Sequence, residues 1–559
     1  MTQNVTEMSM STEPALDPGR WLGLACVLTG LFMILLDLSI VNVAIPAIRI
    51  NLSANNADIQ FVVAGYGLAY AVMLIAGGRL GDIYGRKRLF MLGMAGFIIA
   101  SALCGLSQSA VMLDISRAIQ GFMAALMYPQ VYSVIQVSFP ARERGQVFAI
   151  VGAIIGIATI MGPLVGGLII RSDLTGTAWR WIFLVNVPIG IVALFAASRV
   201  ITESHAVDAS RLDLVGMGLA TLGLGLLVYP LVQGQNSGWP LWTFVCMALS
   251  PVVLALFVLY ERSLSSTKFP LVQLSLFSIP SFRVGVLISA AFLAGIPSFF
   301  FVFVLMLQSG LGYSALHAGL TTVPWTAGVA FASGVSTKIA PRLGKWTIVI
   351  GSLLLVFGTL GIILTLHVAG VGLTSLDLAP AFLIAGLGLG TVIAPLLNII
   401  LAGVPPCCAG SSSGVLTTFQ QLGGAIGIAI VGVVFFSVLS GFAVHSASTA
   451  APTLRNQIDE HQVSAVVGDQ TVAKFRQCFD EQMSSNDPSS APHGCPAAND
   501  PNLSVVGLAL RRAGQLAAAN DFVHAVEVVL FLPAGFWLLT GLLAIVLPRV
   551  RLDGAHSSG

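Results

Sequence analysis

Charged residues are scarce in this chain. Asp, Glu, Lys and Arg make up 9% of its 559 residues, whereas an ordinary soluble protein carries about 25%. Hydrophobic residues make up 56%, and the mean hydropathy is +0.91. One soluble core cannot bury that much apolar surface, and too few charges remain to cover the outside. The composition therefore excludes a soluble enzyme, a nucleic-acid-binding protein and a disordered scaffold, and it indicates an integral membrane protein.

The residue patterns of enzyme and metal sites are also missing. The seven cysteines show no C-x-x-C or Cys/His ligand spacing, and the eight histidines are scattered. We find no nucleophile–base pair and no phosphate-binding glycine loop, so we expect no enzymatic activity, no metal site and no other cofactor. A net charge of +2 identifies no polyanionic partner and no nucleic acid.

Long apolar runs fill most of the sequence. A helix that crosses a ~30 Å hydrocarbon layer needs about 20 mainly apolar residues. By that rule we predict 14 spans, and no alternating segments typical of a transmembrane β-barrel occur. The predicted spans are 22–46, 60–78, 89–107, 111–133, 147–170, 181–199, 214–233, 241–260, 284–308, 316–336, 346–367, 379–403, 413–438 and 522–547.

The positive charges orient these spans, because cytoplasmic loops are enriched in Lys and Arg. With the N-terminus in the cytoplasm, the short outer loops hold only Arg49, Arg171 and Arg180, whereas most other Lys and Arg residues lie in cytoplasmic segments. We therefore expect a multi-pass protein of the cell membrane with both termini cytoplasmic.

One long polar segment interrupts the pattern. Residues 442–521 are predicted to be an extracytoplasmic loop of mostly irregular structure, with a helix around 501–519. Cys478 and Cys495 both lie in it, outside the cytoplasm, where disulfides persist. A disulfide between them and two unrelated free thiols are equally open.

Two cytoplasmic connections resemble each other. In ungapped register, Arg79 of the connection after the second span meets Lys338 of the connection after the tenth, Gly85 meets Gly344, and Arg86 meets Lys345. Such an echo is typical of a transporter built from repeated helix bundles.

We predict two six-helix bundles and an inserted pair. The predicted division is a cytoplasmic tail 1–20, an N-terminal bundle 21–200, inserted helices 7 and 8 with linkers 201–283, helices 9–13 of the C-terminal bundle 284–441, the long outer loop 442–521, helix 14 522–548 and a cytoplasmic tail 549–559.

Two charges lie deep inside predicted spans, where charges are costly and usually functional. Asp37 is roughly 13 Å below the outer end of the first span, and Arg117 is roughly 9 Å below the outer end of the fourth. Their similar depth allows an ion pair across a central cavity. Competition between a proton, Arg117 and a substrate for Asp37 is sufficient for proton-coupled exchange. A purely structural role for each residue is the alternative.

Two further motifs surround this pair. Arg117, Gln120 and Gly121 share one face of the fourth span. The fifth span carries glycines at helix-packing spacing and a proline that we expect to bend it. This string consists of Gly152, Gly156, Gly162, Pro163, Gly166 and Gly167.

Together these strings resemble the major facilitator superfamily, and specifically its 14-helix drug:proton antiporter family. The helix 4 motif, the helix 5 motif of exporters, Leu36 to Pro46 and Trp179 to Pro188 all carry the resemblance, which covers about 20–548. So does the loop between helices 2 and 3, with Gly78, Arg79, Gly81, Asp82, Gly85, Arg86 and Lys87.

The resemblance implies an exporter that uses inward proton movement to expel amphipathic small molecules by alternating access. Asp37 and Arg117 would carry proton coupling, and Asp82, Arg79 and Arg86 would form a cytoplasmic latch between the bundles. The bilayer, protons and an amphipathic substrate are the implied partners of a monomer. Predicted helices 10 and 13 lack the extra acids of some multidrug members, which favours a neutral or anionic substrate over a dication.

Two other functions remain open from the sequence. The first is proton-coupled uptake of a metabolite, against which the helix 5 string argues. The second is a non-transporting membrane sensor or assembly protein, in which the intramembrane charges would have no role.

Overall fold

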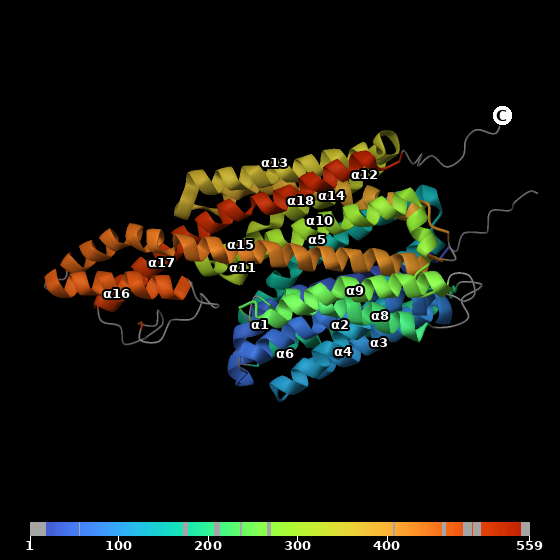
Figure 1. Ribbon diagram of the computed structural model, residues 1–559, viewed down its shortest axis with the longest axis horizontal. Coiled ribbons are helices and arrows are strands. Elements are labelled where there is room, and N and C mark those ends of the chain that lie inside the picture. Colours follow the sequence, from blue (N-terminus) through green and yellow to red (C-terminus); the bar gives the residue numbers. More distant parts are fainter. Residues whose placement is uncertain are drawn as a thin grey trace, which may run out of the picture.

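The computed structural model describes residues 18–54, 56–171, 177–205, 213–234, 238–264, 270–405, 408–460, 465–483, 495 and 505–548. Within these ranges every regular element is a helix (Figure 1). The helices are α1 (Arg20–Asn51), α2 (Asn56–Tyr84), α3 (Arg86–Gly105), α4 (Ala110–Ser138), α5 (Ala141–Arg171), α6 (Trp179–Leu184), α7 (Asn186–Val200), α8 (Leu214–Gln233), α9 (Leu241–Leu264), η1 (Leu274–Ser278), α10 (Pro280–Leu305), η2 (Met306–Gly310), α11 (Ala315–Thr321), α12 (Val323–Leu343), α13 (Trp346–Ala369), η3 (Gly370–Gly372), α14 (Ser375–Ala402), α15 (Ala409–Glu460), α16 (Ala465–Met483), α17 (Val505–Val529) and α18 (Phe531–Val546).

Each predicted span falls on one of these helices or on two consecutive ones. In the described part of the chain, eleven helical segments are long and apolar enough to cross a membrane. The predicted spans at α2, α5 and α12 are not among the eleven, so the number of 14 crossings stays a prediction.

Three predicted spans are each built from two helices, and proline explains the breaks. Pro188, Pro324 and Pro533 follow the breaks between α6 and α7, α11 and α12, and α17 and α18. A proline has no N–H to donate to the carbonyl four residues earlier, and its ring clashes with that carbonyl. The preceding helices accordingly end at Leu184, Thr321 and Val529, which is three or four residues before each proline.

The first six and the last six predicted spans pack in the same pattern. In the N-terminal bundle, α1 packs on α5, α2 on α4 and α3 on α7; in the C-terminal bundle, α10 packs on α15, α12 on α14 and α13 on α18. Between the bundles, α5 packs against α12 and α14, while α15 packs against α2 and α4. The protein is therefore an all-α membrane protein of two six-helix bundles, with α8 and α9 as an inserted pair.

Matched glycines fix the closest approaches within the two bundles. A Cβ on Gly121 of α4 would lie 2.2 Å from the carbonyl oxygen of Tyr66 on α2, and a Cβ on Gly386 of α14 would lie 2.1 Å from that of Trp325 on α12. Only glycine lets the helix backbones approach this closely. The two bundles thus repeat a packing contact as well as a loop motif.

The loop echo is also visible in three dimensions. Gly85 and Gly344 both have positive φ, at 105° and 54°, a region that residues with a Cβ rarely adopt. The Lys87 ammonium donates to the Ser198 carbonyl near the end of α7, at 2.8 Å. The Lys345 ammonium likewise donates to the Ile545 and Leu547 carbonyls at the end of α18. In each bundle a lysine therefore ties the third helix to the end of the sixth.

The outer segment differs from the expectation of mostly irregular structure. The helix α15 continues to Glu460, α16 follows, and α17 already begins at Val505. Figure 1 shows α16 and the outer parts of α15 and α17 projecting beyond one end of the bundles. A disulfide joins Cys478 of α16 to Cys495, with 5.8 Å between their Cα atoms. The helix predicted around 501–519 is confirmed by α17. The prediction of irregular structure for the rest was wrong because it relied on apolar runs, which helices outside the membrane do not require.

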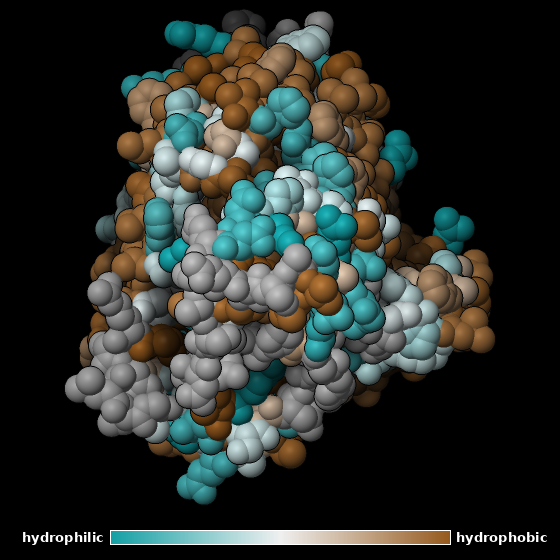
Figure 2. Space-filling view, turned by 90° about the vertical axis from the view of Figure 1, so that its left-hand side faces the viewer, coloured by the Kyte–Doolittle hydropathy of each residue, from teal (hydrophilic) through white to brown (hydrophobic). Residues whose placement is uncertain are grey.

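The surface is apolar along the flanks of the bundles. Figure 2 faces the end at which α16 lies; hydrophilic residues gather in its middle, and hydrophobic residues cover its upper edge and flanks. Large side chains such as Leu92, Phe195 and Phe331 are more than half exposed. Because soluble proteins rarely expose so much apolar surface, these flanks are the lipid-facing surface of a multi-pass membrane protein.

The glycine contacts predict a difference between three alanine variants. Gly121→Ala and Gly386→Ala force a Cβ against a neighbouring backbone, and we expect each to cost about 1–3 kcal/mol of stability. Gly334→Ala in α12 is the matched control, because a Cβ there meets nothing within 4 Å. Thermal unfolding in detergent should show a lower Tm for the first two variants only. Equal Tm values for all three would contradict the proposed close approach.

Candidate functional site

A buried ion pair lies inside the N-terminal bundle. Nη1 of Arg117 on α4 donates to Oδ2 of Asp37 on α1 at 2.5 Å. Neither side chain has any exposed surface. The sequence analysis placed the two residues at similar depth, and the structure brings them together. It differs in one respect, because the pair forms by direct contact between neighbouring helices and not across an open cavity.

Polar side chains from three helices hold Asp37 in place. Gln120, one turn below Arg117 on α4, donates from Nε2 to Oδ1 of Asp37 at 2.9 Å and accepts from Arg117 at 2.8 Å. Asn186 at the start of α7 donates to the same Asp37 oxygen at 3.4 Å and to Ser101 Oγ of α3 at 3.2 Å. Several donors thus stabilise the ionised carboxylate inside the protein.

Arg117 is held from a second side by α2. Its Nε donates to the Val62 carbonyl at 3.0 Å, and its guanidinium lies 4.4 Å from the centre of the Tyr66 ring. This geometry is a cation–π contact between two buried side chains. Its Nη2 atom has no hydrogen-bond partner. The site therefore has an unused donor beside the ion pair.

The helix 5 glycines lie between this site and the other bundle. A Cβ on Gly162 would lie 2.0 Å from Ser39 Oγ on α1, and one on Gly166 would lie 2.9 Å from Ile40. Toward the C-terminal bundle, a Cβ on Gly156 would lie 3.1 Å from the Val329 side chain of α12. The upper glycines thus let α5 approach α1 within three residues of Asp37, and Gly152 and Gly156 let α5 approach the C-terminal bundle. Gly167 is half-buried, and α5 is continuous through Pro163.

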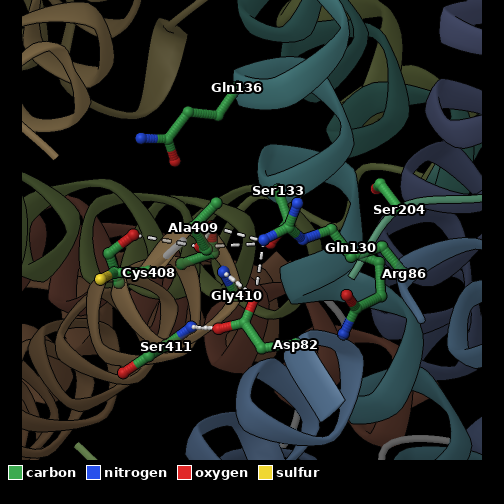
Figure 3. Close-up of polar contacts among 12 residues, drawn as sticks. Asp82, Arg86, Gln130, Ser133, Gln136, Ser204, Cys408, Ala409, Gly410 and Ser411 are labelled. Atoms are coloured by element: carbon green, nitrogen blue, oxygen red, sulfur yellow. Dashed lines mark hydrogen bonds and ion pairs between the residues drawn. The ribbon is translucent and has the colours of Figure 1, made fainter. Parts of the chain in front are cut away.

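A second polar site joins the bundles at the predicted cytoplasmic side. Asp82, at the end of α2, accepts from the backbone N–H of Gly410 at 3.0 Å and of Ser411 at 2.8 Å (Figure 3). These are the second and third residues of α15, whose N–H groups have no partner within the helix. A carboxylate at this position also interacts favourably with the helix dipole. Asp82 of one bundle therefore caps a helix of the other.

The rest of the loop motif supports this cap. The Arg86 guanidinium donates to Oδ1 of Asp82 at 2.8 Å, and both side chains are buried. Arg79 is buried and interacts electrostatically with Asp82. A Cβ on Gly78 would lie 2.3 Å from the Gly410 carbonyl, and one on Gly81 would lie 2.1 Å from Gln130. The glycines of the motif therefore allow close packing around the end of α2, and Asp82 and Arg86 stabilise it through their hydrogen bonds.

Two residues of this contact were not predicted from the sequence. Ser133 on α4 contacts Ser413 Oγ on α15 at 3.1 Å, and Gln136 donates to the Leu401 and Val404 carbonyls at 3.3 and 3.0 Å. Both side chains are buried. Polar residues three apart, at and just beyond the inner end of a predicted span, were the available signal. Ser133 and Gln136 add contacts from α4 to α14, to the turn after it and to α15, so they help to join the bundles at this end.

Two acids lie at the opposite end. Oε1 of Glu527 on α17 is 2.8 Å from Nδ1 of His367 on α13, a contact between surface groups. Asp521, which the sequence analysis assigned to the outer loop, is fully buried and accepts from Ser446 Oγ of α15 at 3.1 Å. Among the described residues, no three His, Cys, Asp or Glu side chains gather closely enough to hold a metal.

Two packed six-helix bundles, with a buried ion pair in one and a polar contact that joins them at one end, have the organisation of a secondary transporter built from repeated bundles. The chain belongs to the Major Facilitator Superfamily, whose profile matches residues 27–428.

Several proteins are similar to this chain in sequence or in fold. The probable actinorhodin transporter of Streptomyces coelicolor is 37% identical over 528 residues, which cover 94% of this chain and 90% of that protein. The tetracenomycin C resistance and export protein of Streptomyces glaucescens is 33% identical, over 75% of this chain and 76% of that protein. Among solved structures, the human organic anion transporter MFSD10 (TETRAN) has the same fold. Its TM-score is 0.54 at 14% identity, over 92% of this chain and 100% of that chain.

Breaking the buried ion pair from one side should cost more than removing both charges. Arg117→Met leaves the Asp37 carboxylate without its counter-ion, a change that costs about 3–5 kcal/mol for a buried pair. We expect the Tm in detergent to fall further for Arg117→Met than for the double variant Asp37→Asn/Arg117→Met. If the double variant is the less stable of the two, the charges do not depend on each other.

The cap at Asp82 predicts how easily the closed end opens. Ser413→Cys, in a chain whose Cys26, Cys104, Cys246, Cys407 and Cys408 are replaced by serine, places a buried thiol at the contact between α4 and α15. Adding Asp82→Asn removes a charged cap worth about 1–2 kcal/mol, so the rate of maleimide labelling at position 413 should rise roughly ten-fold. The control Glu143→Gln alters a cytoplasmic acid that pairs with Arg20 inside the N-terminal bundle. An Asp82→Asn rate no higher than this control would exclude the latch.

Proposed function

We propose that this protein exports amphipathic small molecules in exchange for protons, by alternating access. The observation that carries the proposal is the Asp37–Arg117 pair, a fully buried charge pair in a family of transporters. One relative reported above is named as a probable actinorhodin transporter, and another as a tetracenomycin C resistance and export protein. Export of a drug-like compound is the activity that best fits both the site and the relatives.

Proton coupling follows from what protonation does to the pair. A neutral Asp37 no longer attracts Arg117, so the guanidinium is free to rotate toward other acceptors such as Asn186 Oδ1, which has no hydrogen-bond partner. When Asp37 releases its proton, the carboxylate is ionised again and re-forms the ion pair with Arg117. If the substrate binds only while Asp37 is ionised, a bound substrate and a bound proton exclude each other.

Alternating access requires that one end of the bundles open while the other closes. We assign the closed end in this structure to the cytoplasm, because it carries the Lys- and Arg-rich loops. Asp82, Arg86 and Arg79 would act as the latch of this end. On this proposal the latch must open before substrate can enter from the cytoplasm.

Several further properties belong to the same proposal. The protein would lie in the cell membrane as a monomer with both termini cytoplasmic, driven by the proton gradient without a cofactor. The domain division at 20, 200, 283, 441, 521 and 548 also stays a prediction. Proton-coupled uptake is the second candidate, and the direction of transport distinguishes it from export.

Transport in inside-out membrane vesicles tests the proposal. With an acidic interior, the wild-type protein should accumulate fluorescent amphiphiles from a panel of cationic, neutral and anionic compounds. Asp37→Asn should abolish this accumulation, whereas Asp377→Asn, which alters an exposed acid that caps α14, should retain it. Accumulation that persists in Asp37→Asn would leave an exporter without coupling at Asp37. Accumulation only in right-side-out vesicles would establish uptake.

A further inference from the structure

The inserted helices contact both bundles. The helix α8 packs on α9, on α2 of the N-terminal bundle and on α15 of the C-terminal bundle. In Figure 1 the pair lies alongside α2 and α15. These are the same two helices that Asp82 links. The inserted pair is therefore placed to influence the latch.

A buried acid lies where this pair meets the latch. Glu261, in the last turn of α9, has no exposed surface. Its Oε1 accepts from the Leu271 N–H at 3.1 Å, while its Oε2 has no hydrogen-bond partner. A Cβ on Gly216 of α8 would lie 2.8 Å from Oε1, so α8 covers the carboxylate. Asp213, which caps α8, adds a second negative charge nearby.

A buried carboxylate beside another acid requires a compensating positive charge. Arg79 of the latch motif on α2 is buried, and its guanidinium interacts electrostatically with both Asp82 and Glu261. The acid that caps α15 and the acid in the last turn of α9 are thus both influenced by one arginine.

A second connection runs from Glu261 along the chain. Leu271, held by Glu261, and Val272 are both buried. The next residue, Gln273, accepts from Cys408 Sγ at 2.7 Å, and Cys408 directly precedes α15. Glu261 therefore anchors the short strap 271–273, whose far end contacts the start of the helix that Asp82 caps.

We propose that Glu261 is a positioning residue of the cytoplasmic latch. It holds Arg79 from the side of the inserted pair and fixes the strap 271–273 against the start of α15. The inserted pair is then a working part of the closed end and not only a spacer between the bundles. This inference rests on the alternating-access cycle proposed above, but it does not depend on the substrate or on proton coupling.

The test uses the Ser413→Cys reporter described above, at the α4–α15 contact, but with Cys408 retained so that its contact with Gln273 is unchanged; the same chain without Ser413→Cys gives the background labelling. Glu261→Gln keeps the size of the side chain and removes its charge. We expect it to raise the maleimide labelling rate at position 413 by roughly five-fold or more, while the control Glu143→Gln leaves the rate unchanged. An unchanged rate in Glu261→Gln overturns the proposal.

A double-mutant cycle separates positioning through Arg79 from a general loosening of the fold. In an Arg79→Gln background, Glu261→Gln should add little to the labelling rate, because the two residues act together. If the two substitutions raise the labelling rate by independent factors, Glu261 supports the fold without acting through the latch. That result would overturn the proposal. Labelling needs no transported compound, so a failed vesicle assay leaves this result interpretable.

Discussion

The N-terminal bundle is organised by the cost of burying one carboxylate. An unpaired charge in a low-dielectric interior is strongly unfavourable, and Asp37 is wholly buried. Arg117 supplies the opposite charge, while Gln120 and Asn186 supply further donors. These partners come from α4 and α7, and Ser101 of α3 orients the two amides. Side chains from four helices of one bundle are therefore arranged around Asp37. A change in its charge would be expected to alter how these helices pack.

The ion pair and the latch are joined by one helix. At one end of α2, the Val62 carbonyl and the Tyr66 ring hold Arg117. At its other end, Asp82 caps α15. The 16 residues from Tyr66 to Asp82 span about 24 Å of continuous helix. A change at Arg117 that shifts α2 would therefore also shift the cap, and we propose this helix as the route that couples the ion pair to the latch.

Much of this organisation was predictable from the sequence. Apolar runs predicted the helix positions, because a membrane restricts spanning segments to helices of a set length. Similar depth predicted that Asp37 and Arg117 would be close. The cap at Asp82 was predictable only as a role implied by resemblance, since its partners Gly410 and Ser411 are more than 300 residues away and contribute only backbone N–H groups.

The remaining differences have physical causes. Ser133 and Gln136 resemble ordinary polar residues until α14 and α15 are placed beside them. Asn186 looks like an ordinary polar residue in a predicted span until α1 and α3 are placed beside it. Helix α16 and the outer part of α15 escaped a method based on apolar length, because they lie beyond the predicted spans, whereas the helix predicted around 501–519 is found as the outer part of α17. Glu261 ends an apolar helix, a position at which most acids face water.

The central claim is that Asp37 gains and loses a proton inside the bundle. Infrared difference spectra of the purified protein, recorded as the pH is lowered, measure this directly through the carbonyl band of a protonated carboxylic acid. The account predicts a band in the wild-type protein that is absent from Asp37→Asn and altered in position or midpoint by Arg117→Met. Wild-type and Asp37→Asn spectra that are identical throughout the stable pH range would contradict it.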